Sequence, residues 1–130
     1  MVSVAQYKQM VKKPSKYRSV KVKYVEDGVE KTKDSKKEYS RGLYLKQLEK
    51  SGEISHLQEQ VVFVLQEKIV VDKRVAERAI KFIADYVYCN IHGQPIVEDV
   101  KSWITKRNPT YILKRKMFRK LYPEYIFKES

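Results

Sequence analysis

The chain has 130 residues, of which 42% are hydrophobic and ten are tyrosines, so its composition is that of one globular domain and not of a disordered protein. Lysine and arginine outnumber aspartate and glutamate by 28 to 16, and the net charge of +12 favours a polyanionic partner, above all nucleic acid. The single cysteine excludes an internal disulfide, and no apolar run approaches the roughly 20 residues of a membrane span, so no membrane partner is expected.

A basic arm and a hairpin are expected first. Residues 1–25 contain no acidic residue, and residues 1–15 read as a basic arm or short helix that binds a phosphate backbone. From Arg18 apolar residues alternate, and Asp27-Gly28 is a dipeptide typical of hairpin turns. We therefore predict a hairpin whose second strand covers Val29–Lys33, within a single domain over residues 16–130.

A helix is predicted after the hairpin. Ser35 and Glu38 have the spacing of a capping box, which gives Glu38 a purely structural role as one interpretation. Apolar residues then recur at helical spacing, and Gly52 is placed to end the helix. Gly42 weakens this helix by about 1 kcal/mol relative to alanine unless another group packs closely against it.

Three further strands are predicted in the middle of the chain. They cover residues 54–67, 79–89 and 96–103, and the last two are joined by a turn that contains Gly93. Residues 68–79 have no clear pattern and read as a loop with a short turn.

A second helix and a last strand complete the chain. Asn108 and Pro109 supply a cap and a first-turn proline for a helix over residues 110–122, and residues 124–128 can form a strand. We assign four residues to the apolar side of this helix: Leu113, Met117, Phe118 and Leu121. The order β-β-α-β-β-β-α-β predicts a mixed α/β domain with one sheet and helices against it.

Two of the predicted strands carry charges that are unusual in a buried strand. Alternate residues of a strand face the same side, so Asp99 and Lys101 share a face while Glu98 points the other way. Antiparallel pairing across the Gly93 turn would bring Asp85 close to Asp99. Two neighbouring carboxylates repel unless one is protonated or a cation lies between them, and Mg²⁺ suits oxygen ligands beside a nucleic acid. A solvated ion pair between Asp99 and Lys101 is the alternative interpretation.

The ordered set of Glu38, Asp85, Asp99 and Lys101, followed by a basic helix, resembles the PD-(D/E)XK nuclease superfamily. The chain is similar to a family of small phage-encoded proteins of that superfamily, long described only as a domain of unknown function. The resemblance extends from Lys16 to Phe127. It is carried by the stretches KYRSVKV, DSKKEYSRGLYLKQLEKSGEISHLQEQVVFVL, FIADYVY, IVEDVK and LKRKMFRKLYP.

The resemblance implies a restriction-endonuclease-like mixed sheet flanked by helices and a nuclease that depends on Mg²⁺, with Mn²⁺ as a substitute. It assigns Asp85 and Asp99 as metal ligands, with the backbone carbonyl of Val100 as a third ligand. Glu38 completes the site from the helix, directly or through water. Lys101 orients the attacking water or helps to deprotonate it.

One position departs from the pattern of the superfamily, and one ligand has a rival. Ala84 stands where the motif has the proline of its first letter, a position that varies in the superfamily and carries no chemistry. Glu98 is the rival to Asp99, but it faces away from Lys101 in the predicted strand.

Basic residues supply the expected substrate surface. Residues 101–120 contain eight lysines and arginines and no acidic residue. The residues expected to bind DNA are Lys106, Arg107, Lys114, Arg115, Arg119 and Lys120.

Small nucleases of this superfamily include phage Holliday-junction resolvases, which are commonly homodimers. The resemblance therefore implies an endonuclease selective for branched DNA, acting in phage replication or recombination in the cytoplasm of an infected bacterium. Three alternatives stay open: a nicking or non-specific endonuclease, a non-enzymatic basic protein that binds nucleic acid on the same fold, and a structural protein of an RNA–protein particle.

Overall fold

The computed structural model describes residues 21–26, 28–33 and 35–130, and the chain divides into two compact units after Lys36. The predicted basic arm of residues 1–15 and the start of the first predicted strand lie outside the described residues. In the first unit, β1 (Val22–Glu26) and β2 (Val29–Lys33) form the predicted antiparallel hairpin. Gly28 has a φ of 76° in its turn, a conformation that glycine adopts without strain.

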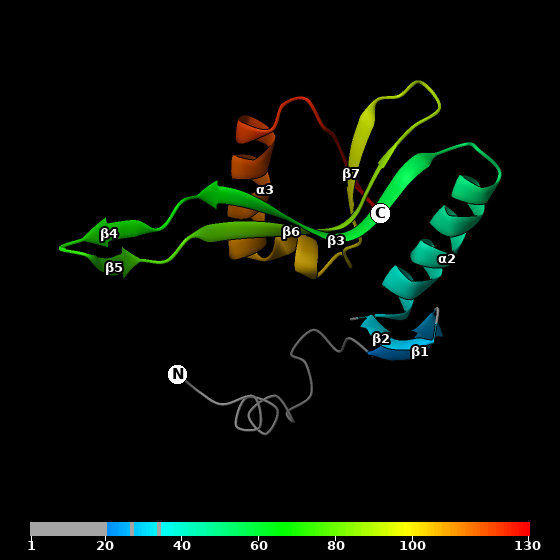
Figure 1. Ribbon diagram of the computed structural model, residues 1–130, viewed down its shortest axis with the longest axis horizontal. Coiled ribbons are helices and arrows are strands. Elements are labelled where there is room, and N and C mark those ends of the chain that lie inside the picture. The colour runs from blue at the N-terminus through cyan, green and yellow to red at the C-terminus, as the bar shows by residue number, and fades with distance from the viewer. Residues whose placement is uncertain (1–20, 27, 34) are drawn as a thin grey trace. The chain divides into compact units, whose positions relative to one another are not determined.

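The second unit contains a mixed four-stranded sheet with strand order β3-β6-β7-β8 (Figure 1). β3 and β7 both pair antiparallel with β6, whereas β8 pairs parallel with β7. The elements are α2 (Lys36–Lys50), β3 (Ser55–Gln66), β6 (Ile80–Cys89), β7 (Pro95–Asp99), a short η1 helix (Thr105–Arg107), α3 (Pro109–Leu121) and β8 (Ile126–Glu129). The prediction of a mixed α/β protein with two helices is confirmed, but the prediction of one sheet is wrong, because the described residues form this sheet and two separate two-stranded sheets. In the described part of the chain, no helix combines the length and the apolarity needed to cross a membrane.

The two helices pack on opposite faces of this sheet. On β7, Val97 belongs to the core that includes Phe118 of α3, and its neighbour Ile96 packs on the core that includes Leu45 of α2. Because successive residues of a strand point to opposite faces, these two cores lie on either side of the sheet.

The packed side of α3 differs from the predicted one. Phe118 is fully buried and Met117 packs against the same core, but Leu113 and Leu121 are 58% and 49% exposed. Aromatic side chains of α3 and of the segment after it cover the sheet in their place, with the Phe118 ring stacked on Phe82 at 5.1 Å between centroids. These rings bury more apolar area than leucine does, which favours the rotation of the helix that they occupy.

The segment predicted as a loop over residues 68–79 is a hairpin. β4 (Ile69–Val71) and β5 (Arg74–Glu77) pair antiparallel and prolong the ribbon made by β3 and β6 (Figure 1). Asp72 and Lys73 both have positive φ, as a two-residue turn between twisted strands requires. Every residue of the two strands is exposed, so the sequence lacks the alternation that a buried face imposes.

The strand predicted over residues 96–103 is shorter than expected. β7 ends at Asp99, and Trp103 lies in a turn instead of on the strand face. The chain end fixes the segment after β7, because Ser130 N–H donates to the Asp99 carbonyl at 3.1 Å and Lys101 N–H donates to the Ser130 carbonyl at 3.0 Å.

Candidate functional site

Asp85 and Asp99 come together where β6 and β7 pair. The predicted antiparallel pairing is confirmed, with Tyr86 opposite Glu98, so Asp85 and Asp99 are the next facing residues. The backbone N–H of Val100 donates to Asp85 Oδ2 at 2.7 Å, which ties the end of β7 to the Asp85 carboxylate. The structure thus places the two predicted ligands and the predicted ligating residue Val100 in one cluster.

Asp99 is a buried carboxylate with little to stabilise its charge. It is 1% exposed, and among the described residues neither of its oxygens has a hydrogen-bond partner. Lys101 Nζ approaches Oδ2 to 3.2 Å as an ion pair, without the angles of a hydrogen bond. Burial and the negative charge of Asp85 raise the pKa of Asp99 to about 8, and the Lys101 ammonium opposes this shift.

Gln60 joins Glu38 to the carboxylate pair. Its Nε2 donates to Glu38 Oε1 at 2.8 Å and to Asp85 Oδ1 at 3.4 Å, so both carboxylates lie within reach of one amide. Gln60 has a φ of 53° and lies between Glu59 and Val61, which pair with the residues on either side of Asp85. The sequence pattern did not single out Gln60.

The sheet changes face at the position of Gln60 and Asp85. Ala84 belongs to the core under α3, whereas Tyr86, two residues later, belongs to the core under α2. An undisturbed strand would put both on one face. The left-handed conformation of Gln60 coincides with this change of face. The side chains of Gln60 and Asp85 therefore lie at the boundary between the two cores.

A glycine contact sets the position of Glu38. The Tyr86 hydroxyl donates to the Glu38 carbonyl at 2.7 Å, and a Cβ on Gly42 would lie 2.4 Å from that hydroxyl oxygen. Gly42 therefore lets α2 approach β6 beside Asp85. This close packing accounts for a glycine inside a helix, where it is less favourable than alanine. The Glu38 side chain is buried in the first turn of α2.

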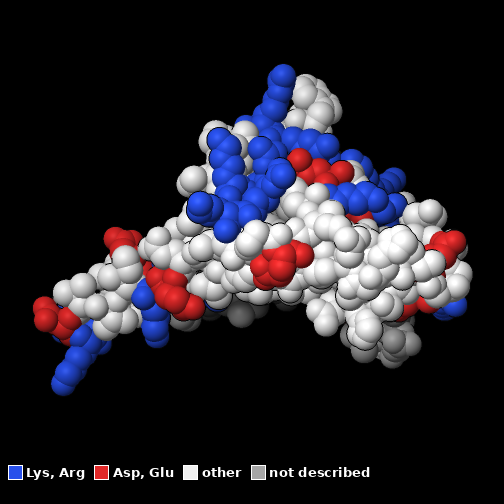
Figure 2. Space-filling model, turned by 90° about the horizontal axis from the view of Figure 1, so that it is seen from above, with Lys and Arg blue, Asp and Glu red and all other residues white. Residues whose placement is uncertain are grey.

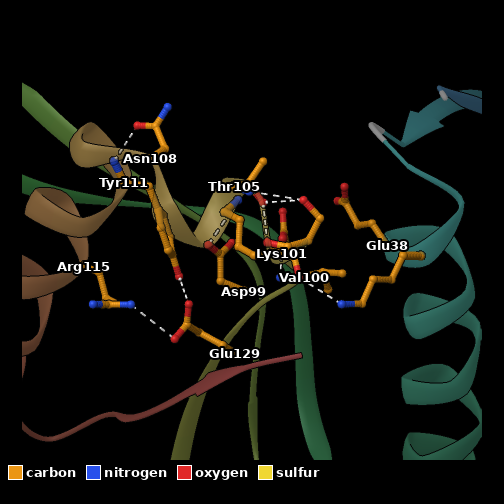
Figure 3. A network of polar contacts seen from close by, with 12 residues as sticks. Glu38, Asp99, Val100, Lys101, Thr105, Asn108, Tyr111, Arg115 and Glu129 are labelled. Carbon is orange, nitrogen blue, oxygen red and sulfur yellow. Dashed lines mark hydrogen bonds and ion pairs between the residues drawn. The ribbon is translucent and has the colours of Figure 1, made fainter. Parts of the chain in front are cut away.

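Lys101 is held from both helices (Figure 3). Its Nζ lies 5.2 Å from the centre of the Tyr111 ring, and Lys37 Nζ donates to its carbonyl at 2.9 Å. The Tyr111 hydroxyl donates to Glu129 Oε2 at 2.7 Å, and Arg115 Nη1 donates to Glu129 Oε1 at 3.4 Å. Burial and the bond to Glu129 raise the pKa of Tyr111 above its usual range. Sequence reasoning missed Lys37, Tyr111 and Glu129, whose roles depend on contacts between distant elements.

Glu98, the rival to Asp99, is fully paired. Arg41 donates to both of its oxygens, and the Tyr88 hydroxyl and Ser130 Oγ donate to one each, at 2.7 Å and 2.9 Å. Burial acts to raise the pKa of Glu98, but these hydrogen bonds and the Arg41 charge outweigh it and hold the pKa below its usual range. Glu98 therefore has donors for both oxygens, which Asp99 lacks.

The basic residues expected to bind DNA differ in exposure. Arg107, Arg119 and Lys120 are exposed, whereas Lys106 and Lys114 are half-buried. Arg115 pairs with Glu129 and lies 5.8 Å from the centre of the Tyr111 ring. Figure 2 shows lysine and arginine side chains gathered over α3.

A family model described as "Protein of unknown function (DUF1064)" matches residues 14–129. The chain belongs to this family. Comparison with curated proteins and with solved structures gave no match.

The donor set in this DUF1064 chain fits a magnesium ion. Within the described residues, no group of three or more His, Cys, Asp or Glu side chains is arranged to hold a metal. Mg²⁺ is commonly held by one or two carboxylates together with waters and substrate phosphates, and Asp85 and Asp99 are two carboxylates of this kind. The observation that fits a cation best is that neither oxygen of buried Asp99 has a hydrogen-bond partner among the described residues, and only Oδ2 has an ion pair, with Lys101.

Proposed function

We propose that the chain is a metal-dependent endonuclease of the PD-(D/E)XK type that hydrolyses phosphodiester bonds in branched DNA. The observation that carries this proposal is buried Asp99, which lies beside Asp85 with no hydrogen-bond donor to its oxygens among the described residues. A buried carboxylate is costly unless it is protonated or meets a cation, and the Lys101 ammonium opposes the rise of the Asp99 pKa without reversing it. Strongly raised pKa values of this kind are frequent at active sites.

The metal-binding residues in this proposal are Asp85, Asp99 and the carbonyl of Val100. Glu38 joins them through the Gln60 amide or a water. When bound, Mg²⁺ or Mn²⁺ lowers the pKa of a water and neutralises charge on the phosphate.

Lys101 supplies the second positive charge of the proposed site. Its ammonium is oriented by Asp99 Oδ2 and by the Tyr111 ring, and it can bind a phosphate oxygen or the attacking water. Arg115 is better described as a positioning residue, because its bond to Glu129 holds Tyr111 in place.

The proposed substrate rests on charge and on the resemblance. The exposed basic residues of η1 and α3 can follow a phosphate backbone, and binding should weaken steeply with salt. We further propose a homodimer, because paired cuts at a junction need two sites, and a role in phage replication or recombination in the cytoplasm of an infected bacterium.

The test is cleavage of a labelled four-way junction beside a matched linear duplex and a single strand, with Mg²⁺, Mn²⁺ or EDTA. We expect paired cuts in the junction with either metal and none in EDTA. Lys101→Ala should slow cleavage by at least about a hundred-fold. The matched control is Lys81→Ala, which removes an exposed lysine of β6 outside the site.

Asp85→Ala separates catalysis from binding. We expect it to abolish cleavage while junction binding, measured in EDTA, is retained. Equal cutting of all three substrates would overturn selectivity for branched DNA and leave a non-specific nuclease. Tight binding without cutting under any metal would overturn the enzyme and leave a basic binding protein on the same fold.

A further inference from the structure

Trp103 is a large aromatic side chain that the proposed metal site does not use. It is the only tryptophan of the chain and is 68% exposed, although a tryptophan of a globular domain is usually well buried. It lies two residues after Lys101, and two residues span at most about 7 Å of chain. The backbone of Trp103 is therefore within about 7 Å of the backbone of Lys101, a residue of the proposed cleavage centre.

The turn that carries Trp103 is held by its own hydrogen bonds. Ser102 Oγ accepts from Thr105 N–H at 3.2 Å, and Thr105 Oγ1 donates to the Ser102 carbonyl at 3.0 Å. Lys106 N–H also donates to the Ser102 carbonyl, at 3.0 Å. The exposed Trp103 therefore belongs to a turn whose backbone is held by several hydrogen bonds.

Arg107 stacks on the indole. Its guanidinium carbon lies 5.3 Å from the centre of the Trp103 ring, within the range of a cation–π contact. The ring remains 68% exposed with Arg107 in place, so the aromatic surface is available to another planar group. Lys106 adds a second positive charge beside it, and residues 100–123 contain no acidic residue.

We propose that Trp103, backed by Arg107, is a stacking site for an unpaired nucleobase beside the scissile phosphate. This inference rests on the proposed nuclease and narrows its substrate to DNA in which a base next to the cut is unstacked, as at a flap, a splayed arm or a junction crossover. In a continuous duplex both faces of each base are covered by neighbours, so the indole has nothing to stack on. Aromatic stacking contributes about 1–3 kcal/mol per base in proteins that bind single strands.

The intrinsic fluorescence of Trp103 reports this contact directly, since no other tryptophan contributes. In EDTA, where no cleavage occurs, we expect a short oligothymidylate to quench the emission and a blunt duplex to leave it nearly unchanged. Polyphosphate serves as a polyanion without bases, and equal quenching by polyphosphate would overturn the proposal.

Variants measure the contribution of the ring. Trp103→Ala should weaken binding of a labelled oligothymidylate by about ten-fold or more, as followed by anisotropy, and leave duplex binding unchanged. Trp103→Phe should restore part of the affinity. Leu113→Ala, which truncates another exposed apolar residue, on α3, is the matched control and should bind like the wild type.

The outcomes separate this inference from the nuclease proposal. Metal-dependent cleavage together with unchanged oligonucleotide affinity in Trp103→Ala would overturn the stacking site and leave the nuclease. Quenching by the oligonucleotide without any cleavage would support the stacking site and overturn the nuclease. A loss of affinity that is equal for single strand and duplex would show a general binding defect and overturn base stacking.

Discussion

Gly42→Ala tests whether the contact between α2 and β6 sets the position of Glu38. The new Cβ would lie 2.4 Å from the Tyr86 hydroxyl oxygen and 3.2 Å from the ring carbon that carries it. Tyr86 is fully buried, so its ring cannot move aside freely. The hydroxyl must shift, and its bond to the Glu38 carbonyl is lost or weakened.

The magnitude follows from two opposing effects. Alanine at a helix interior is favoured over glycine by about 1 kcal/mol. Overpacking costs about 1–3 kcal/mol, and leaving buried hydrogen-bond partners unpaired costs a similar amount. We therefore expect Gly42→Ala to lower the free energy of unfolding by about 1–5 kcal/mol.

Urea unfolding followed by circular dichroism gives the free energies for this comparison. Ser40→Ala, at an exposed position of the same helix, is the control for helix propensity and should be neutral or slightly stabilising. In the Tyr86→Phe background the hydroxyl is absent, so Gly42→Ala should cost less than in the wild type, and the difference is the coupling energy. If Gly42→Ala instead stabilised the protein by about 1 kcal/mol, the close contact would be refuted.

Three further predictions concern the charged groups and a helix cap. In EDTA the free energy of unfolding should fall from about pH 4 to pH 8, by at most about 1.4 kcal/mol per pH unit, because folded Asp99, with a pKa of about 8, keeps a proton that the unfolded chain releases. Asp99→Asn should flatten this profile, and a variant profile identical to that of the wild type would contradict the raised pKa of Asp99. Glu98 has a lowered pKa, so its stabilisation is present above the usual carboxylate pKa and is lost as pH falls through the folded value; Glu98→Gln should therefore destabilise at neutral pH, and the gap from wild type should narrow in acid. Asn108→Ala removes the side-chain acceptor for Tyr111 N–H and should lower the free energy of unfolding by about 1 kcal/mol, as measured in a thermal melt. An unchanged melting temperature would contradict a stabilising cap.

The strands of the candidate site could be predicted from local patterns. Two apolar runs separated by a turn containing Gly93 predict an antiparallel pair, and counting along this pair brings Asp85 opposite Asp99. The preference for Asp99 over Glu98 came from strand alternation alone. Alternation gives faces correctly only while the strand continues, and the strand predicted over residues 96–103 ends at Asp99, so Lys101 and Trp103 both lie beyond it.

The remaining contacts depend on features that a linear pattern does not contain. Gln60, which bonds to both Glu38 and Asp85, has a positive φ that its sequence neighbours do not predict. The β4–β5 hairpin turns at Asp72 and Lys73, although such turns favour Asn-Gly or Asp-Gly. The rotation of α3 was set by competition between aromatic and aliphatic side chains for one core, which periodicity alone does not decide.

The pairing of β8 with β7 bears on the order in which the chain folds. β6 pairs with β7 across a short turn, but β8 reaches β7 only after η1 and α3, and such distant pairings form late. β8 has four residues and lies at the sheet edge, where local opening needs the least free energy. Its release would free the bonds between Ser130 and the Asp99–Lys101 segment while β3, β6 and α2 stayed folded. The buried carboxylates would then meet solvent and cations through the opening of one short strand, without unfolding of the sheet.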